Sequence, residues 1–156
     1  MWKAILFPSP PSSRASLGLL VLRLVAGAAM ANHGWGKIQN PFHWLDKAES
    51  PPPAFLQFLA AFSEFAGGIA LLLGALTVLA SVGIAFTMME AVRHHVSGGD
   101  PFGKWELALL FFAISVFLFC AGPGRISVDA YLGRRIGVGR EELAASPSRA
   151  LDELDG

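Results

Sequence analysis

The stretch that decides the fold runs from Ala54 to Val92 and reads AFLQFLAAFSEFAGGIALLLGALTVLASVGIAFTMMEAV. It is one nearly continuous apolar block, and a single helix of that length would extend about 58 Å at about 1.5 Å per residue. The hydrocarbon core of a bilayer is about 30 Å thick, so the block is nearly twice as long as one crossing requires. We therefore predict two membrane-spanning helices, joined by a tight turn near Gly74 to Thr77.

Two further apolar blocks flank this one, at residues 15–33 and 105–121. Each fits one crossing, which takes roughly 20 residues. The predicted fold class is therefore all-α, an integral membrane four-helix transmembrane bundle with helices at about 15–33, 54–74, 76–96 and 105–121. Residues 1–14 form a Pro/Ser-rich lead-in, residues 15–132 the membrane domain, and residues 133–156 a charged, partly disordered cytoplasmic tail.

The composition excludes several other classes of protein. Hydrophobic residues make up 53% of the chain and charged residues 15%, against about 25% charged in soluble domains. The net charge is zero and no basic block stands out, so no nucleic-acid partner is expected. Cys120 is the one cysteine, which excludes an internal disulfide and a CxxC redox pair. The apolar run at Ala4 to Phe7 is too short for a secretory signal.

The distribution of lysine and arginine predicts the orientation. With four crossings both termini share a side, and cytoplasmic loops carry an excess of these residues. The side of the termini holds Lys3, Arg14, Arg125, Arg134, Arg135 and Arg140, and the other side holds Lys37, Lys47, Arg93 and Lys104. Six against four places both termini in the cytoplasm and the chain in the cell inner (plasma) membrane as a multi-pass protein.

Two ionisable residues fall deep inside predicted helices. A charge at the bilayer centre costs at least about 2.5–3.5 kcal/mol, so it needs a partner. Counting from the helix ends puts Arg23 about 12 Å from the inner side and Glu64 about 15 Å from the outer side. In a core of about 30 Å these depths nearly coincide. We predict that Arg23 and Glu64 face the interior and pair, either as a ligand site or as a device that fixes helix register.

A second polar set is predicted at the outer mouth of the bundle. Helices 1 and 3 end on the side where helix 4 begins, so their terminal side chains are placed to converge. The set comprises His33, Glu90, His94 and Glu106. Glu90 and His94 lie one helical turn apart on one face and are suited to proton exchange. The alternative is ordinary polar residues at the water boundary. The spacing matches no ligand signature, and no metal is predicted.

Taken in order, a series of short motifs resembles the DoxX family over about residues 17 to 132. The motifs are Arg23, His33-Gly34-x-x-Lys37, Glu64-x-x-Gly67-Gly68, Leu71-Leu72-Leu73-Gly74, Met88-Met89-Glu90-Ala91, Glu106 with Leu109-Leu110, and Gly122-Pro123-Gly124-Arg125-Ile126-Ser127-Val128-Asp129. The resemblance implies a four-helix integral membrane protein associated with redox systems. Members are described as subunits of quinol or thiosulfate:quinone oxidoreductases and as partners in membrane oxidoreductase complexes.

Three functions remain open at this point. The first is a redox-associated subunit that binds a quinone or similar lipophilic small molecule, with Arg23 and Glu64 as the polar floor of the site. Because the chain has no cysteine pair, flavin motif or spanning haem-ligand pair, any redox cofactor would belong to a partner subunit or be the quinone itself. The second is a non-catalytic scaffold or assembly factor of an oxidoreductase complex. The third is a small-solute or proton pathway, for which four helices would need a homodimer. Membrane lipid is the expected surrounding in each case.

Overall fold

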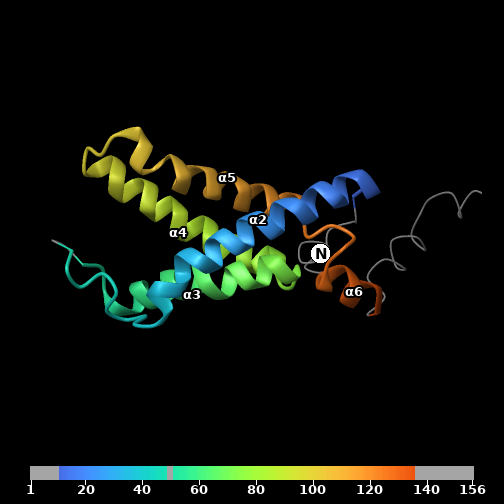
Figure 1. The fold of residues 1–156 in the computed structure, drawn as a ribbon, viewed down its shortest axis with the longest axis horizontal. Coiled ribbons are helices and arrows are strands. Elements are labelled where there is room, and N and C mark those ends of the chain that lie inside the picture. Colours follow the sequence, from blue (N-terminus) through green and yellow to red (C-terminus); the bar gives the residue numbers. More distant parts are fainter. Residues whose placement is uncertain (1–10, 49–50, 136–156) are drawn as a thin grey trace, which may run out of the picture.

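The computed structural model describes residues 11–48 and 51–135, and these form five α-helices and one short 3₁₀ helix (Figure 1). The four long helices are α2 (Ser13–Ile38), α3 (Ala54–Leu73), α4 (Thr77–Ser97) and α5 (Glu106–Ala121), and a short α6 (Val128–Arg135) follows. The 3₁₀ helix η1 (Phe102–Lys104) precedes α5. No strand occurs in the described ranges, so the all-α prediction is confirmed for them.

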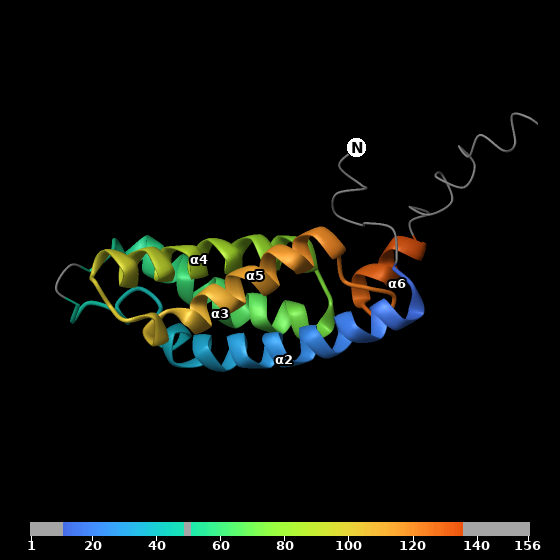
Figure 2. The same ribbon diagram turned by 90° about the horizontal axis from the view of Figure 1, so that it is seen from above.

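The long helices run along one axis, which gives the molecule two ends (Figures 1 and 2). At one end lie residues 39–48 and 51–53, which belong to the connection between α2 and α3, and residues 98–105, which connect α4 to α5. We call this the loop end. At the other end lie the α3–α4 turn, Gly74–Leu76, the start of α2, and α6. We call this the turn end.

Glycines set how closely α2 and α3 pack. An added Cβ at Gly27 would lie 2.7 Å from the carbonyl oxygen of Gly68, and one at Gly34 would collide with the backbone of Phe65. Such close approach of two backbones is possible only where side chains are absent. These contacts fix the register of the two helices, with Gly34 beside Phe65 and Gly27 between Gly68 and Leu72.

The α3–α4 turn uses two left-handed residues. Gly74 ends α3 with φ of 64°, the usual conformation of a helix C-cap. Leu76 precedes α4 with φ of 50°, which is uncommon for a residue with a side chain. Asp129, far along the chain, stabilises this turn: its carboxylate oxygens accept hydrogen bonds from the backbone N–H of Leu76 and Thr77, both at 2.8 Å.

The first helix is longer than the predicted 15–33 at both ends. Ser12 caps its start by accepting a hydrogen bond from Ala15 N–H, and the helix continues through Gly34 and Lys37 until Ile38. At the turn end α2 projects beyond the α3–α4 turn. Arg23 is the residue of α2 that contacts Gly74, so the ten residues of α2 before it extend past the end of α3. Most of the predicted lead-in and all of the tail beyond Arg135 lie outside the described residues.

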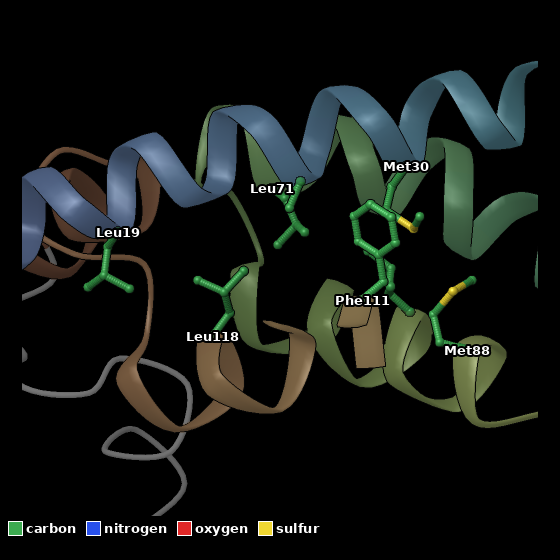
Figure 3. Close-up of a cluster of buried hydrophobic side chains, with 8 residues drawn as sticks. Leu19, Met30, Leu71, Met88, Phe111 and Leu118 are labelled. Atoms are coloured by element: carbon green, nitrogen blue, oxygen red, sulfur yellow. The ribbon is translucent and has the colours of Figure 1, made fainter. Parts of the chain in front are cut away.

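The apolar core is a column of side chains between α2 and the other long helices (Figure 3). Leu71 and Leu118 point toward each other in the half nearer the turn end. Met30, Phe111 and Met88 meet in the half nearer the loop end. The remaining members of this cluster are Leu19, Ala26 and Ile84.

Much of the apolar surface lies outside this core. Val25, Phe55 and Leu79 are each more than 60% exposed. Among the described helices, α2 and α3 are long and apolar enough to cross a membrane, and α5 is apolar but shorter, with 16 residues. Only 28% of the most apolar 18-residue stretch of α3 is buried inside the molecule.

Candidate functional site

An ion pair joins α2 and α3 near the loop end. Lys37 Nζ lies 2.6 Å from Glu64 Oε1, and the side chains are 27% and 3% exposed, respectively. The second oxygen of the carboxylate, Oε2, is buried and has no hydrogen-bond partner among the described residues. Glu64 is therefore a buried acid with one oxygen bound to a cation and one oxygen free to bind another group.

The connection between α2 and α3 covers this pair. Lys37 Nζ lies 4.5 Å from the centre of the Trp44 ring, which is within range for a cation–π contact. Trp44 Nε1 donates a 2.9 Å hydrogen bond to the backbone oxygen of Gln57 in α3. One indole therefore packs over the ammonium group and is fixed to the neighbouring helix.

Gln57 holds the rest of this connection in place. Its buried side chain accepts a hydrogen bond from Leu45 N–H at 2.9 Å and donates to Asp46 Oδ1 and to the Pro52 oxygen, both at 3.0 Å. The hydrogen bond from Gln57, followed by that from His43, lowers the pKa of Asp46 below its ordinary 3.8. One buried amide thus orders the segment that covers Lys37 and Glu64.

The second buried cation, Arg23, belongs to a different site at the turn end. Arg23 Nη2 donates a 2.5 Å hydrogen bond to the carbonyl oxygen of Ile126, and its guanidinium contacts Gly74 so closely that no side chain fits there. Asp129 is its charge partner at longer range. Arg23 Nε and Nη1 have no hydrogen-bond partner in residues 11–48 and 51–135.

The predicted pairing of Arg23 with Glu64 is therefore wrong. Arg23 is level with Gly74, which is ten residues beyond Glu64 in α3 and hence about 15 Å away along the axis. The prediction placed the start of the first helix, at residue 15, level with the end of the second helix, at residue 74. Instead α2 projects past α3, and the segment after α5 packs on the projection: Gly124 lies beside Leu19, and Arg125 N–H donates to Ser16 Oγ at 3.2 Å.

The four residues predicted at the outer mouth do not form a compact cluster. His33 is exposed, and its ring makes an edge contact with Phe111 of α5, with the ring centres 6.2 Å apart. Glu90 pairs with Arg93 on the same helix at 2.7 Å. His94 and Glu106 are exposed. Within the described ranges, no three His, Cys, Asp or Glu side chains are grouped closely enough to share a metal ion.

A different group of polar side chains forms at the loop end. Asp100 accepts hydrogen bonds from Lys104 Nζ at 2.8 Å and pairs with His95 Nδ1 at 2.9 Å. The bond to His95 and then the bond to Lys104 lower the pKa of Asp100 below its ordinary 3.8. These contacts close the turn between α4 and η1, and they involve none of the four predicted residues.

The sequence analysis singled out the buried residues Arg23 and Glu64 but not their charged partners, Asp129 and Lys37. Lys37 and Asp129 both stand within the motifs quoted above, yet Lys37 was used only for orientation and Asp129 was given no role. Two signals pointed to them: Lys37 is four residues after His33, on the same face of a helix, and Asp129 follows a Gly-Pro-Gly break after an apolar helix. Gln57 carried no comparable signal.

The Lys37–Glu64 arrangement has defined chemical capacities. An ammonium group 27% exposed can donate a hydrogen bond to a ligand oxygen while it remains paired with the carboxylate. The free carboxylate oxygen can accept a hydrogen bond or a proton. The indole of Trp44 offers a flat apolar surface beside both groups.

Comparisons with known proteins agree with the sequence motifs. The sequence model of the family described as DoxX matches residues 18–95. The chain is 31% identical over 127 residues to the inner membrane protein YqjF of Escherichia coli strain K12, an alignment that covers 76% of this chain and 95% of that protein. No solved structure shows significant similarity to the chain.

Proposed function

The chain belongs to the DoxX family, and on this basis we propose that it is a four-span inner-membrane subunit of a redox system that binds a quinone or similar lipophilic small molecule. The Lys37–Glu64 pair is the proposed binding site. Of the six residues expected from the sequence, the proposed site keeps only Glu64, and it adds Lys37 and Trp44. Arg23 lies at the opposite end, Glu90 pairs with Arg93, and His33, His94 and Glu106 are exposed.

The exposed apolar surface supports membrane spans. Large apolar side chains cover the outside of all four long helices, including Val25, Phe62, Leu79 and Phe117. Monomeric soluble proteins rarely expose continuous apolar patches of this kind. A relative named as an inner membrane protein aligns over nearly its whole length. We propose that α2 to α5 each cross the bilayer, with both termini in the cytoplasm as the charge distribution favours.

The observation that carries the proposed ligand is the free, buried oxygen of Glu64. A buried polar atom without a partner costs about 1–3 kcal/mol, and more when it is charged. A hydrogen-bond donor on a ligand would offset this cost at Glu64. Glu64 lies between two membrane helices, next to a half-buried cation and a tryptophan, which is a suitable environment for a flat molecule that carries polar oxygens.

In this proposal each residue has a separate task. Lys37 Nζ donates a hydrogen bond to a carbonyl oxygen of the ligand, and Trp44 packs against its ring. Glu64 holds or releases a proton beside the bound ring. The chain has a single cysteine, so the group that exchanges electrons with the ligand would belong to a partner oxidoreductase subunit.

Direct titration tests this proposal. A short-chain ubiquinone analogue is added to the purified protein in detergent, and binding is measured by calorimetry. We expect Lys37→Met and Glu64→Gln each to weaken binding about tenfold or more, since each removes a charge-assisted hydrogen bond. Glu90→Gln is the matched control, because it makes the same change in a carboxylate already paired with Arg93. Wild-type affinity in a folded Glu64→Gln protein would exclude the site.

A scaffold role is the second candidate, and the contacts of Asp129 favour it. Asp129 and Arg23 act only within the fold, where they tie the segment after α5 to the α3–α4 turn. If the Lys37–Glu64 pair is equally structural, the double variant Lys37→Met/Glu64→Met should fold and still copurify with its partner subunits. A ligand site would lose quinone binding in the same variant.

A further inference from the structure

The outward face of α6 is apolar, although the helix is short and lies at the end of the molecule. Val128, Tyr131 and Leu132, three and four residues apart, are 40%, 50% and 46% exposed and share one side of the helix. Asp129 is buried, and Gly133, one turn later, is half-buried on the opposite side. The side turned away from the rest of the protein therefore carries these three apolar side chains, and Arg135, one turn after Tyr131, lies on the same side with its guanidinium 5.3 Å from the Tyr131 ring.

The contacts of Asp129 fix the level of α6 along the molecule. Its N–H donates a 2.9 Å hydrogen bond to the oxygen of Gly74, and its carboxylate caps α4 at Leu76 and Thr77. The first turn of α6 is thus held at the level of the α3–α4 turn (Figure 1). If α3 and α4 cross the bilayer, this level is the boundary between hydrocarbon and headgroups.

Positive charge is concentrated at the same end of the molecule. The exposed residues Arg14, Arg125, Arg134 and Arg135 all lie at the turn end. Arg125 Nη1 donates to Ser13 Oγ, and Arg135 Nη2 donates to the Tyr131 hydroxyl at 2.9 Å, so both contacts are with neutral groups. The one carboxylate of α6, that of Asp129, is directed inward to the N–H groups of α4.

We propose that α6 and Arg125 form a binding surface for anionic phospholipids. In this arrangement Val128, Tyr131 and Leu132 enter the acyl boundary of the cytoplasmic leaflet, and the guanidinium groups of Arg125, Arg134 and Arg135 bind lipid phosphates. Apolar side chains beside arginines are the arrangement by which amphipathic helices bind the interface of an anionic membrane. The inference rests on the membrane spans of the proposed function and is independent of the quinone site, which lies at the other end.

Lipid selectivity in a reconstituted bilayer tests the inference. The full chain is placed in phosphatidylcholine vesicles with trace spin-labelled phosphatidylglycerol or spin-labelled phosphatidylcholine, and the motionally restricted fraction of each lipid is measured. We expect a several-fold preference for phosphatidylglycerol that weakens at high salt, because exposed charges are screened. In the triple variant Arg125→Gln/Arg134→Gln/Arg135→Gln the preference should fall to the phosphatidylcholine level, with the melting temperature retained.

The matched control removes three charges at the loop end. Lys47→Gln/Arg93→Gln/Lys104→Gln should keep the preference, since Arg93 and Lys104 already pair with carboxylates. Equal loss in both triple variants, or no preference in the wild type, would overturn the inference. A preference that emerges only after Glu141→Gln/Glu142→Gln would mean that these two glutamates, and not lipid phosphates, bind the arginines. That result would also overturn the inference. Absence of any restricted lipid would contradict the membrane spans themselves.

Discussion

At the residue scale, the Lys37–Glu64 pair has an uneven environment. Glu64 is almost fully buried, whereas Lys37 reaches the surface beneath Trp44. Removing a carboxylate from water costs several kcal/mol, and the nearby ammonium group offsets much of that cost. The cost of burying Glu64 therefore depends on Lys37, and the contributions of the two side chains to stability are coupled.

Single and double substitutions measure this dependence. Lys37→Met leaves a buried carboxylate without a cation, and we expect it to lower the free energy of unfolding by about 3–5 kcal/mol. Lys37→Met/Glu64→Met should regain most of the loss, since the buried charge is then gone. Thermal unfolding in detergent gives both values. Lys104→Met is the control, because its pair with Asp100 is exposed and its loss should change stability little. Additive losses in the double variant would contradict the coupling.

The sequence analysis predicted that Arg23 and Glu64 pair with each other, whereas the structure pairs Glu64 with Lys37 and Arg23 with the Ile126 carbonyl. Arg23 and Glu64 are both buried, as a charge within an apolar helix requires. Their partners depend on the axial offset between α2 and α3. The observed offset differs from the predicted one by about two helical turns, which changes the predicted pairing. Nothing in the composition of the two helices reports that offset, which is set by contacts between backbones.

At the element scale, glycines on α2 and α3 determine the offset. An added Cβ at Gly34 would collide with the Phe65 backbone, and one at Gly68 would collide with the Ala31 backbone. We expect Gly34→Ala and Gly68→Ala each to lower the free energy of unfolding by about 1–3 kcal/mol. Gly36→Ala, two residues from Gly34 on the same helix, has no atom within 4 Å of its added Cβ. It should be neutral or stabilising by up to about 1 kcal/mol, and denaturation of the three variants compares them directly.

The α4–α5 connection gives a prediction for acid stability. Because hydrogen bonds from His95 and Lys104 lower the pKa of Asp100 in the folded protein, its stabilising contribution is fully present above the ordinary value of 3.8. The contribution is lost as pH falls through the lower folded-state value. The difference in melting temperature between wild type and Asp100→Asn should therefore be retained down to about pH 4 and shrink below that. A difference that grows as the pH falls below about 4 would contradict the assignment.

Helix positions followed from apolar blocks and from breaks at proline and glycine, whereas the ends of α2 did not. Gly34 and Gly36 near its C-terminal end look like a helix stop, yet the helix continues to Ile38 because α3 packs tightly against Gly34. Tertiary contact outweighs the low helix propensity of glycine there. Likewise, Asp129 caps a helix that begins more than fifty positions earlier, which no local pattern predicts.

At the scale of the whole molecule, apolar and polar side chains are distributed in an unusual way. Exposed leucine, valine and phenylalanine cover the long helices, while the fully buried set includes Arg23, Gln57, Thr77 and Ser81. Arg23 and Gln57 hydrogen-bond to segments outside their own helices, and the apolar side chains outside are exposed rather than packed against other described residues. This distribution matches a protein whose solvent along the helices is lipid.

Cysteine labelling in intact cells tests these spans most directly. In a Cys120→Ala background, single cysteines replace Ser13, Ala48, Ala75, Gly99, Arg125 and Glu64, and a membrane-impermeant maleimide is applied before and after permeabilisation. We predict labelling from outside at positions 48 and 99, labelling only after permeabilisation at 13, 75 and 125, and protection at 64. Reaction of position 75 from outside, or ready reaction of position 64, would contradict four crossings with Glu64 between the helices.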